Sequence, residues 1–537
     1  MTYPGIDSDH QVDTVAAVHP DYQAMCPAWD TADDVAFGGA RAVKAAGRLY
    51  LPPLAWVEDA AAKYKAYVLR AVFSNAVLRT RVAIEGQVFR TPPQVVIPSS
   101  VLSTDDAEDL LARFAHDGAS FEVFARRVFS QVFGMSRAVA VIDVTPAGEP
   151  VATLYGAKAM PNWWTAPVEG RVQGVRTIFA EITYEATGSY TRRAVPVRRE
   201  YLWVLGDPPV EYTRPPSATG YLTVVEHRYV AGAWRMGAPS IPSRRGVTLS
   251  TFPVTVINPY DLGYATTEPV LSEMMDVNLS LYRTSADLEH GRHFAGVPAP
   301  YVFGVKKGTA IELGSSTFLT SENPAAKAGF IEFTAQGLRA LEVAVTEKTL
   351  QLVEAGARLF APQSGGHSTY EAGRLESAAD RSIVESVART VSHGLTLVLA
   401  QAIAARAPQA ASVEEIRSEI TVRLNTDYEP LPLTATDAIR WTEAFLKDGI
   451  SRETMWEVFQ RGGVYPPGWS MAEEHASIAA ARVARAAMAP DTMPPGTGSQ
   501  FGRAPRRTPQ GDRRVQGTRD ASGESQGSPS RSDGPPA

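Results

Sequence analysis

Residues 268–294 read EPVLSEMMDVNLSLYRTSADLEHGRHF, and this stretch decides the architecture that we expect for the chain. Pro269 suits the first turn of a helix, because the N–H group that proline lacks would have no partner there. Apolar or small residues then recur at alternating steps of four and three, among mostly charged and polar ones. The pattern predicts a helix over residues 266–294 with one narrow apolar seam, formed by Val270, Met274, Val277, Leu281, Thr284 and Leu288.

The residues that follow predict a short β-rich excursion and a return to helix. Residues 297–320 combine β-branched and aromatic residues with Gly and Pro at short intervals, which is typical of short strands joined by turns. A leucine or valine then recurs every seven residues, which predicts a second helix over 335–360 with its own single seam: Leu338, Val345, Leu352 and Leu359.

A Gly/Ser-rich loop, QSGGHSTYEAG at residues 363–373, separates this helix from a third one. The third helix, expected over 374–406, has a more hydrophobic face, so we expect it to be buried. Its most apolar stretch, residues 395–405, is too short to span a bilayer.

The segments before and after these three helices predict an α+β class with a helical C-terminal part. Residues 22–87 and 105–133 have helical patterning, the latter ending before Gly134. Strands are expected at residues 138–144, 177–184, 198–204, 222–229 and 251–257. Three short helices are expected at 437–447, 451–461 and from Ser470, whose spacing from Glu473 suits a capping box.

The expected helix at 266–294 and the six residues after it match the motif DxNxxxYRxSADLExGxHFxGxPxP, from Asp276 through Tyr282 and Gly291 to Pro300. Further matching segments lie at residues 19–22, 90–93, 121–126, 327–333, 356–359 and 425–428. On these residues the chain resembles the portal proteins of tailed bacteriophages, over roughly residues 20–463. Residues 37–40, FGGA, depart from the family, whose members more often have a charged helical stretch there.

The resemblance implies an order of structural parts along the chain. These are an N-terminal α+β wing (1–265), a first stem helix (266–294), a clip (295–334), a second stem helix (335–360), a tunnel loop with a long wing helix (361–433), a helical crown (434–488) and a disordered tail (489–537). The tail's lack of large apolar residues supports the last assignment independently, since such a segment cannot bury enough surface to fold.

The resemblance also implies candidate functional residues of three kinds. A DNA-facing tunnel loop would include Gln363, Ser364, His367, Ser368 and Tyr370, and a docking surface on the clip would include Lys306 and Lys307, which a solvated turn would explain equally well. We further expect the helical seams to pack on the next subunit of a ring, through Met274, Val277, Leu281, Leu288, Leu338, Val345 and Leu352.

Composition is that of a globular protein. Hydrophobic residues make up 44% and charged residues 20% of the 537, and we recognise no signal peptide at the N-terminus. A single cysteine excludes an internal disulfide framework. Residues 491–537 hold seven arginines against five acids, which leaves the rest of the chain with 45 basic and 53 acidic residues, a net charge of −8. An acidic body favours a channel along which DNA slides over one that grips it.

Catalytic alternatives have weak support. Asp287, Glu289, His290 and His293 are residue types that bind metals, but no second ligand cluster accompanies them. The glycines of residues 304–309 do not have phosphate-loop spacing, and the one GxSxG match, residues 523–527, lies in the expected disordered tail. We therefore expect no catalytic residue, no bound metal and no cofactor.

The resemblance implies a homododecameric ring at one vertex of the virion capsid. Double-stranded DNA would enter through it during packaging and leave through it during ejection. Expected partners are the terminase large subunit, the major capsid and scaffold proteins, a head-to-tail adaptor and the passing DNA, with assembly in the host cytoplasm and no membrane. The alternatives are a head-to-tail connector or adaptor ring and, with less support, a metal-dependent nuclease.

Overall fold

A computed structural model describes most of the chain. The described residues are 15–53, 61–145, 147–168, 171–296, 299–304, 323–331, 336–359, 382–407, 411–426, 428, 435–447, 449, 451–461 and 470–488. The chain divides into two compact units, Met1–Pro467 and Gly468–Ala537. Helices and antiparallel sheets are mixed in the first unit, in agreement with the predicted α+β class.

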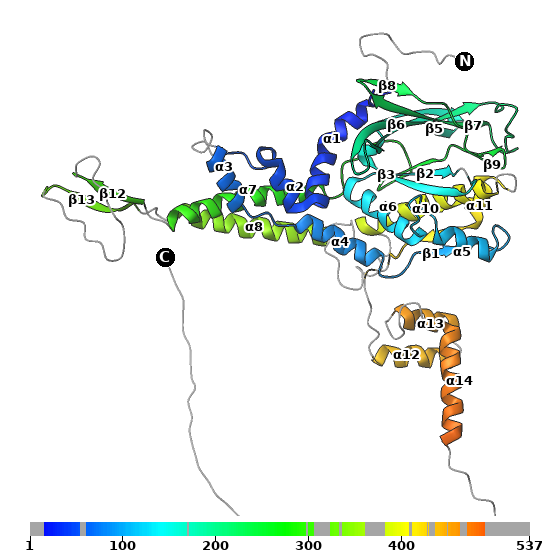
Figure 1. The fold of residues 1–537 in the computed structure, drawn as a ribbon. Helices are drawn as coiled ribbons and strands as arrows, with labels where there is room; N and C mark the ends of the chain where they lie inside the picture. The colour runs from blue at the N-terminus through cyan, green and yellow to red at the C-terminus, as the bar shows by residue number, and fades with distance from the viewer. Residues whose placement is uncertain are drawn as a thin grey trace, which may run out of the picture. The chain divides into compact units, whose positions relative to one another are not determined.

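A layer of helices forms the N-terminal part of the first unit (Figure 1). Its members are α1 (Pro20–Ala32), a π-helix (Asp33–Gly38), α2 (Gly39–Ala46), α3 (Ala61–Arg70) and α4 (Ala76–Val88). The break between the π-helix and α2 falls within the FGGA segment. Gly39 adopts φ +61° there, and the side-chain oxygen of Asn75 accepts a hydrogen bond from the N–H of Ala40 at 2.7 Å.

The main core lies between a three-stranded antiparallel sheet and two long helices. The sheet has the order β11-β2-β3, with β2 (Ala138–Val144) at its centre between β3 (Pro150–Gly156) and β11 (Val254–Ile257). Helices α6 (Phe121–Met135) and α10 (Ile383–Arg406) pack on this sheet, and α5 (Thr104–Ala112) packs on α6.

Helix α10 is the buried helix that its hydrophobic face predicted. A Cβ added at Gly394 would lie 2.6 Å from Ile257 Cδ1, so the helix approaches the sheet closely at this glycine. The helix is long and apolar enough to cross a membrane, so the expectation that no stretch here reaches that length is wrong. Since 78% of its most apolar window is buried inside the protein, we regard α10 as a core helix.

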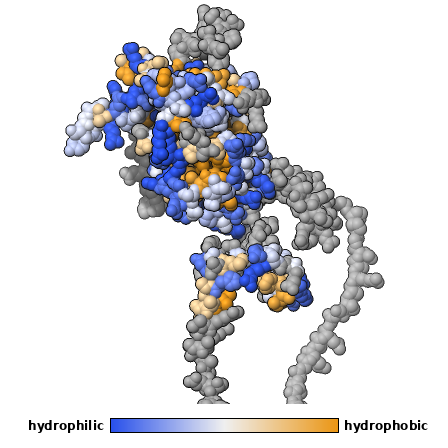
Figure 2. All heavy atoms as spheres, turned by 90° about the vertical axis from the view of Figure 1, so that its right-hand side faces the viewer, coloured by the Kyte–Doolittle hydropathy of each residue, from blue (hydrophilic) through white to orange (hydrophobic). Residues whose placement is uncertain are grey.

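A second, five-stranded sheet is an antiparallel meander in sequence order. It consists of β4 (Asn162–Val168), β5 (Arg171–Ala186), β6 (Arg192–Leu205), β7 (Gly220–Val230) and β8 (Ala233–Met236). All five predicted strand segments overlap strands of the two sheets, whereas β3, β4 and β8 were not predicted. A short hairpin of β9 (Ser243–Arg244) and β10 (Val247–Thr248) follows. Hydrophilic residues cover much of the side shown in Figure 2, around a smaller hydrophobic area.

The remaining elements complete the two units. Helix α7 (Ser272–Ala295), hairpin β12–β13 (Ala299–Phe303 with Lys327–Ile331) and helix α8 (Gln336–Arg358) follow one another in the sequence. Helix α11 (Val413–Glu419) leads into β14 (Thr421–Arg423), which pairs antiparallel with β1 (Gln94–Val96). Helices α12 (Ala435–Leu446) and α13 (Arg452–Arg461) belong to the first unit.

In the second unit, the described residues form α14 (Met471–Met488). The predicted capping box begins this helix: the N–H of Ser470 donates to Glu473 Oε2 at 2.7 Å, and the N–H of Glu473 donates to Ser470 Oγ at 3.2 Å. The three predicted C-terminal helices are thus confirmed, with boundaries within two residues of those expected.

Candidate functional site: the α7–α8 helix pair

Helix α7 starts six residues later than predicted. Pro269 lies in the preceding turn, where its carbonyl accepts a hydrogen bond from the N–H of Ser272 at 2.9 Å. The helix ends where the N–H of Gly296 donates to the Arg292 carbonyl at 2.9 Å. Because hairpin β12–β13 returns the chain, α8 runs antiparallel beside α7 (Figure 1).

Polar contacts fix the register of the two helices. Near the middle, Lys348 Nζ donates to Thr284 Oγ1 at 2.6 Å and to the Ser280 carbonyl at 3.4 Å. One ion pair lies toward each end of the pair, Arg292 with Glu342 at 2.9 Å and Arg358 with Glu273 at 3.6 Å. All four charged side chains are at least 49% exposed, so these two pairs contribute little stability and mainly select the register.

Gly291 allows the helices to approach closely near the hairpin. A Cβ at this position would lie 2.5 Å from Leu338 Cδ2, a distance at which the leucine would have to move. The leucine of the α8 seam therefore packs directly over the α7 backbone. Glycine is favoured here by the lack of space and not by its backbone angles.

The predicted seams face each other inside one chain and not a second copy. Met274, Leu281, Leu288 and Leu352 are buried, Val277 and Val345 are partly buried against the core, and Leu338 is half-buried. The prediction that the four buried side chains contact the next subunit is therefore wrong. The physical reason is that the hairpin folds α8 back onto α7, so each seam already has its apolar partner.

A second face of α7, which was not predicted, packs on the N-terminal helices. Tyr67 on α3 donates its hydroxyl hydrogen to Asp287 at 2.6 Å, and the Tyr282 ring meets the Phe73 ring edge-on at 5.4 Å. Asn278 Nδ2 donates to the Ser74 carbonyl at 3.0 Å. Helix α7 is thus a central helix between two layers, and not a helix that is polar on most faces.

His290 is buried where α3 meets α7. Neither of its ring nitrogens has a hydrogen-bond partner, and the ring packs edge-on against Tyr67 at 5.2 Å and Phe294 at 4.7 Å. Burial lowers the pKa of His290, interactions with Arg70 and His293 lower it further, and Asp287 opposes them. This environment favours the neutral imidazole.

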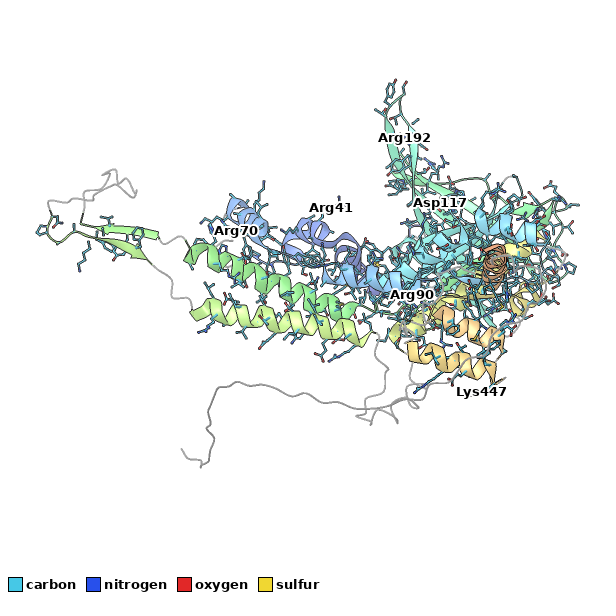
Figure 3. All side chains as sticks on the ribbon, turned by 90° about the horizontal axis from the view of Figure 1, so that it is seen from below. Arg41, Arg70, Arg90, Asp117, Arg192 and Lys447 are labelled. Carbon is cyan, nitrogen blue, oxygen red and sulfur yellow. The ribbon has the colours of Figure 1, made fainter. Side chains whose placement is uncertain are left out.

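The four candidate metal-binding side chains of this stretch do not converge. Asp287 accepts from Tyr67, Glu289 pairs with Arg292 at 3.0 Å, and His293 Nε2 lies 3.1 Å from Arg70. Figure 3 shows Arg70 on α3, beside this helix pair. Among the residues that the structure describes, no group of three His, Cys, Asp or Glu side chains could hold a metal ion.

The outer face of α8 carries exposed apolar side chains. Val343, Leu350 and Val353 are 54%, 63% and 67% exposed, and they recur at steps of seven and three along one side of the helix. On the opposite side of α7, helix α3 and the residues after it expose Leu69 and Val72 at 71% and 59%. The helical region thus has an apolar face on each of two sides, which we call the α8 face (Val343, Leu350, Val353) and the α3 face (Leu69, Val72).

The other predicted site residues lie outside the described residues. This holds for the tunnel-loop candidates Gln363, Ser364, His367, Ser368 and Tyr370, for the clip residues Lys306 and Lys307, and for the tail at 489–537. Within residues 295–334, which the resemblance assigns to a clip, the structure describes the β12–β13 hairpin, in which Tyr301 pairs with Gly329.

Comparisons with known proteins give one family match and several distant structural similarities. No curated protein matches the chain. The chain is similar to a protein in the "virion of native gene transfer agent (GTA) particle", with 12% identity and a TM-score of 0.35, covering 79% of this chain and 99% of that one. Two neck structures are also similar. One is of the empty particle computed with C6 symmetry (13% identity, TM-score 0.35, 73% and 91% covered). The other is of the native particle computed with C12 symmetry (11% identity, TM-score 0.32, covering 73% of this chain and 90% of that one). A family model described as "Domain of unknown function (DUF4055)" matches residues 270–404, the stretch from the start of α7 almost to the end of α10.

Proposed function

We propose that this chain is a portal protein, which forms a homododecameric ring at one vertex of a phage-like capsid. Double-stranded DNA would pass through its channel during packaging and ejection. The observation that carries this proposal is the helical region, where α7 is enclosed between α8 and the N-terminal helices while both outer sides present exposed apolar faces. The resemblance of residues 276–300 to the portal motif supports it independently.

Two different apolar faces on one chain fit assembly into a ring. A closed cyclic assembly uses one heterologous contact, in which a surface of each copy meets a different surface of the next. Helices α8 and α3 lie on opposite sides of α7 (Figure 1). One copy would therefore offer the exposed side chains of the α8 face to one neighbour and those of the α3 face to the other.

The other parts of the proposal follow from the order of elements. Hairpin β12–β13 joins the ends of α7 and α8, so it would stand at one end of each stem and offer a docking surface to the terminase large subunit and later to a head-to-tail adaptor. The wing and the C-terminal helices would contact major capsid and scaffold proteins. We assign the chain no catalytic role, so the terminase supplies the energy for packaging.

Native mass spectrometry and negative-stain imaging of the purified full chain test this function. We expect rings of twelve copies with an axial channel. In infected cells, these rings would assemble in the host cytoplasm and remain in the virion. A chain that stays monomeric or dimeric at every concentration would refute the proposal. Binding of the terminase large subunit to the ring, lost on deletion of β12–β13, would distinguish a portal from a head-to-tail adaptor ring.

A further inference from the structure

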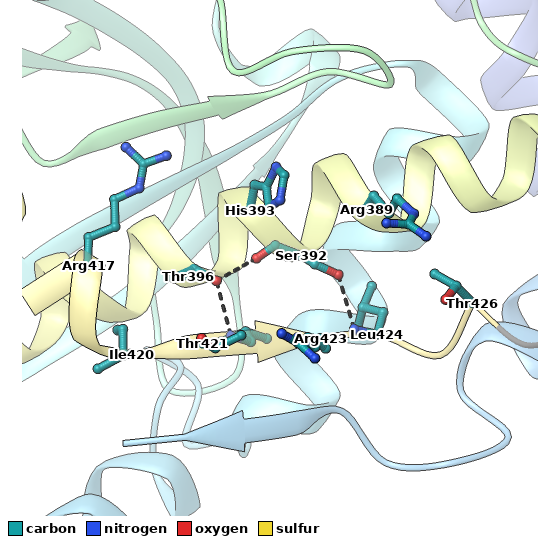
Figure 4. A pocket seen from close by; sticks show the side chains of 11 residues that line it. Arg389, Ser392, His393, Thr396, Arg417, Ile420, Thr421, Arg423, Leu424 and Thr426 are labelled. Atoms are coloured by element: carbon teal, nitrogen blue, oxygen red, sulfur yellow. Dashed lines mark hydrogen bonds between the residues drawn. The ribbon is translucent and has the colours of Figure 1, made fainter. Parts of the chain in front are cut away.

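A groove lined by basic side chains lies between α10 and the segment formed by α11 and β14. Arg389 and His393 come from the exposed side of α10, Arg417 from α11 and Arg423 from β14 (Figure 4). The cavity has a volume of about 620 Å³ and is open to solvent. We call it the basic groove.

The hydroxyl groups of buried Ser392 and half-buried Thr396 fix the backbone that lines the basic groove. Ser392 Oγ donates to the Ala388 carbonyl at 2.7 Å and accepts from the N–H of Leu424 at 3.0 Å. Thr396 Oγ1 donates to the Ser392 carbonyl at 2.8 Å and accepts from the N–H of Val422 at 3.1 Å. These hydrogen bonds join the β14 segment to α10, so the backbone that carries the basic side chains is already fixed in the chain alone.

The groove has an excess of positive charge, although the whole chain is acidic. Arg389 pairs with Glu385 at 2.6 Å and Arg417 lies 3.7 Å from Glu414, which leaves each of these arginines partly neutralised. His393 and Arg423 have no side-chain hydrogen bond or ion pair within the described part of the chain. None of the described residues that line the groove is acidic. An anion is therefore the ligand that this surface favours.

The arrangement of the charges favours an extended polyanion over a single small anion. Arg417 lies at one end of the groove and Arg389 toward the other, so the basic groups follow its length (Figure 4). Arginine forks bind phosphate oxygens strongly, and the hydroxyls of Thr421 and Thr426 add further donors. No aromatic side chain other than His393 lines the groove in the described structure, so it lacks the stacking surface that single strands prefer.

We propose that the basic groove binds the phosphate backbone of double-stranded DNA without reading its sequence. This inference deepens the proposed function by naming a surface that contacts the DNA, but the binding is measurable whether or not the chain forms rings. Contact through a few arginines in each copy would hold DNA loosely, because each contact is salt-sensitive and independent of sequence.

Fluorescence anisotropy with a short labelled DNA duplex of mixed sequence tests the proposal. We compare the full-length chain with the double variant Arg389→Gln/Arg423→Gln, both of whose sites are exposed. Removing two phosphate contacts should weaken binding about tenfold near 0.1 M salt and reduce the slope of log K against log salt by about two. The control is Arg41→Gln, on α2, whose exposed side chain has no partner among the described residues and which should bind like the wild type (Figure 3).

Other outcomes would overturn the inference. Unchanged affinity and salt slope in the double variant would place any DNA contact elsewhere, since arginines outside the groove are the same in both chains. Displacement of the duplex by inorganic phosphate at equal phosphate concentration would indicate a small-anion site, and tighter binding of poly-glutamate than of DNA would indicate an acidic peptide partner. Native mass spectrometry of the same samples separates the two claims: rings without groove-dependent binding contradict only the groove, and binding without rings contradicts only the portal.

Discussion

At the scale of single residues, glycines determine how closely the helices approach. Gly39 combines a positive φ with a crowded site, because an added Cβ would lie 2.8 Å from the Asn75 side-chain oxygen. Gly134 lies inside α6, although it was expected to follow the end of that helix. A Cβ there would lie 2.6 Å from the Phe37 ring, and the helix instead ends at Ser136, which has φ 56°. The sequence shows a glycine at both positions, but only the fold shows whether the position needs a positive φ or lacks space for a side chain.

The substitution Gly39→Ala should destabilise the protein by about 1–3 kcal/mol, because the left-handed backbone and the contact with Asn75 both oppose a side chain. Gly86→Ala is the matched control. Gly86 is exposed within α4 and has nothing within 4 Å of an added Cβ, so it should gain about 0.5–1 kcal/mol. Urea unfolding measures both, and equal effects would contradict the role assigned to Gly39.

His290 predicts a pH dependence of stability. Its pKa in the folded chain is below the usual 6.5, so the unfolded chain binds the proton more readily. Its contribution to stability is therefore present above pH 6.5 and is lost as the pH falls through that value toward the folded pKa. His290→Phe, which keeps an aromatic ring against Tyr67, should flatten the dependence of the urea midpoint on pH between about 5 and 7.

His19, whose pKa burial also lowers, contributes in the same direction and should account for part of the slope that remains. The interpretation fails if His290→Phe keeps the full wild-type slope. It also fails if the variant becomes more sensitive to acid, because removal of a buried imidazole cannot add a proton-binding site to the unfolded chain.

At the scale of elements, the sequence predicted α7 and α8 but assigned their seams to the wrong partner. The seam of α7 was visible because it contains Met and Leu at regular steps. The second buried face was not, because Asn278, Tyr282, Ala286 and His290 include polar and small residues that periodicity does not register as apolar. These side chains are buried because α3 and the segment between α3 and α4 supply specific hydrogen bonds and ring contacts, which no local pattern reveals.

The substitution Leu281→Asp should therefore unfold the helix pair instead of only blocking assembly. Leu281 is buried between α7 and α8, and an unpaired carboxylate there should cost more than about 3 kcal/mol. Arg283→Asp introduces the same side chain at an exposed position two residues away and should change stability by less than about 0.5 kcal/mol. A Leu281→Asp chain with wild-type stability in urea would show that this seam is not buried within the chain.

At the scale of the whole molecule, the sequence predicted the α+β class, the order of the elements and the burial of α10. It did not predict the pairing of β14 with β1, which joins residues more than 300 positions apart, nor the groove that this pairing helps to form. Contacts of that kind depend on the complete fold. The basic residues of the groove are scattered singly over residues 389–423, so no charge cluster marks them.

The central claim is that copies of this chain join through the α8 face and the α3 face. Leu350→Asp and Leu69→Asp place a charge at the centre of each face, and both side chains are exposed, so the folded single chain should survive. Leu205→Asp, at a 61% exposed leucine of β6, is the control. Native mass spectrometry of the three variants beside the wild type should give rings for the wild type and Leu205→Asp, and single chains for the other two. Intact rings from both Leu350→Asp and Leu69→Asp would contradict the claim.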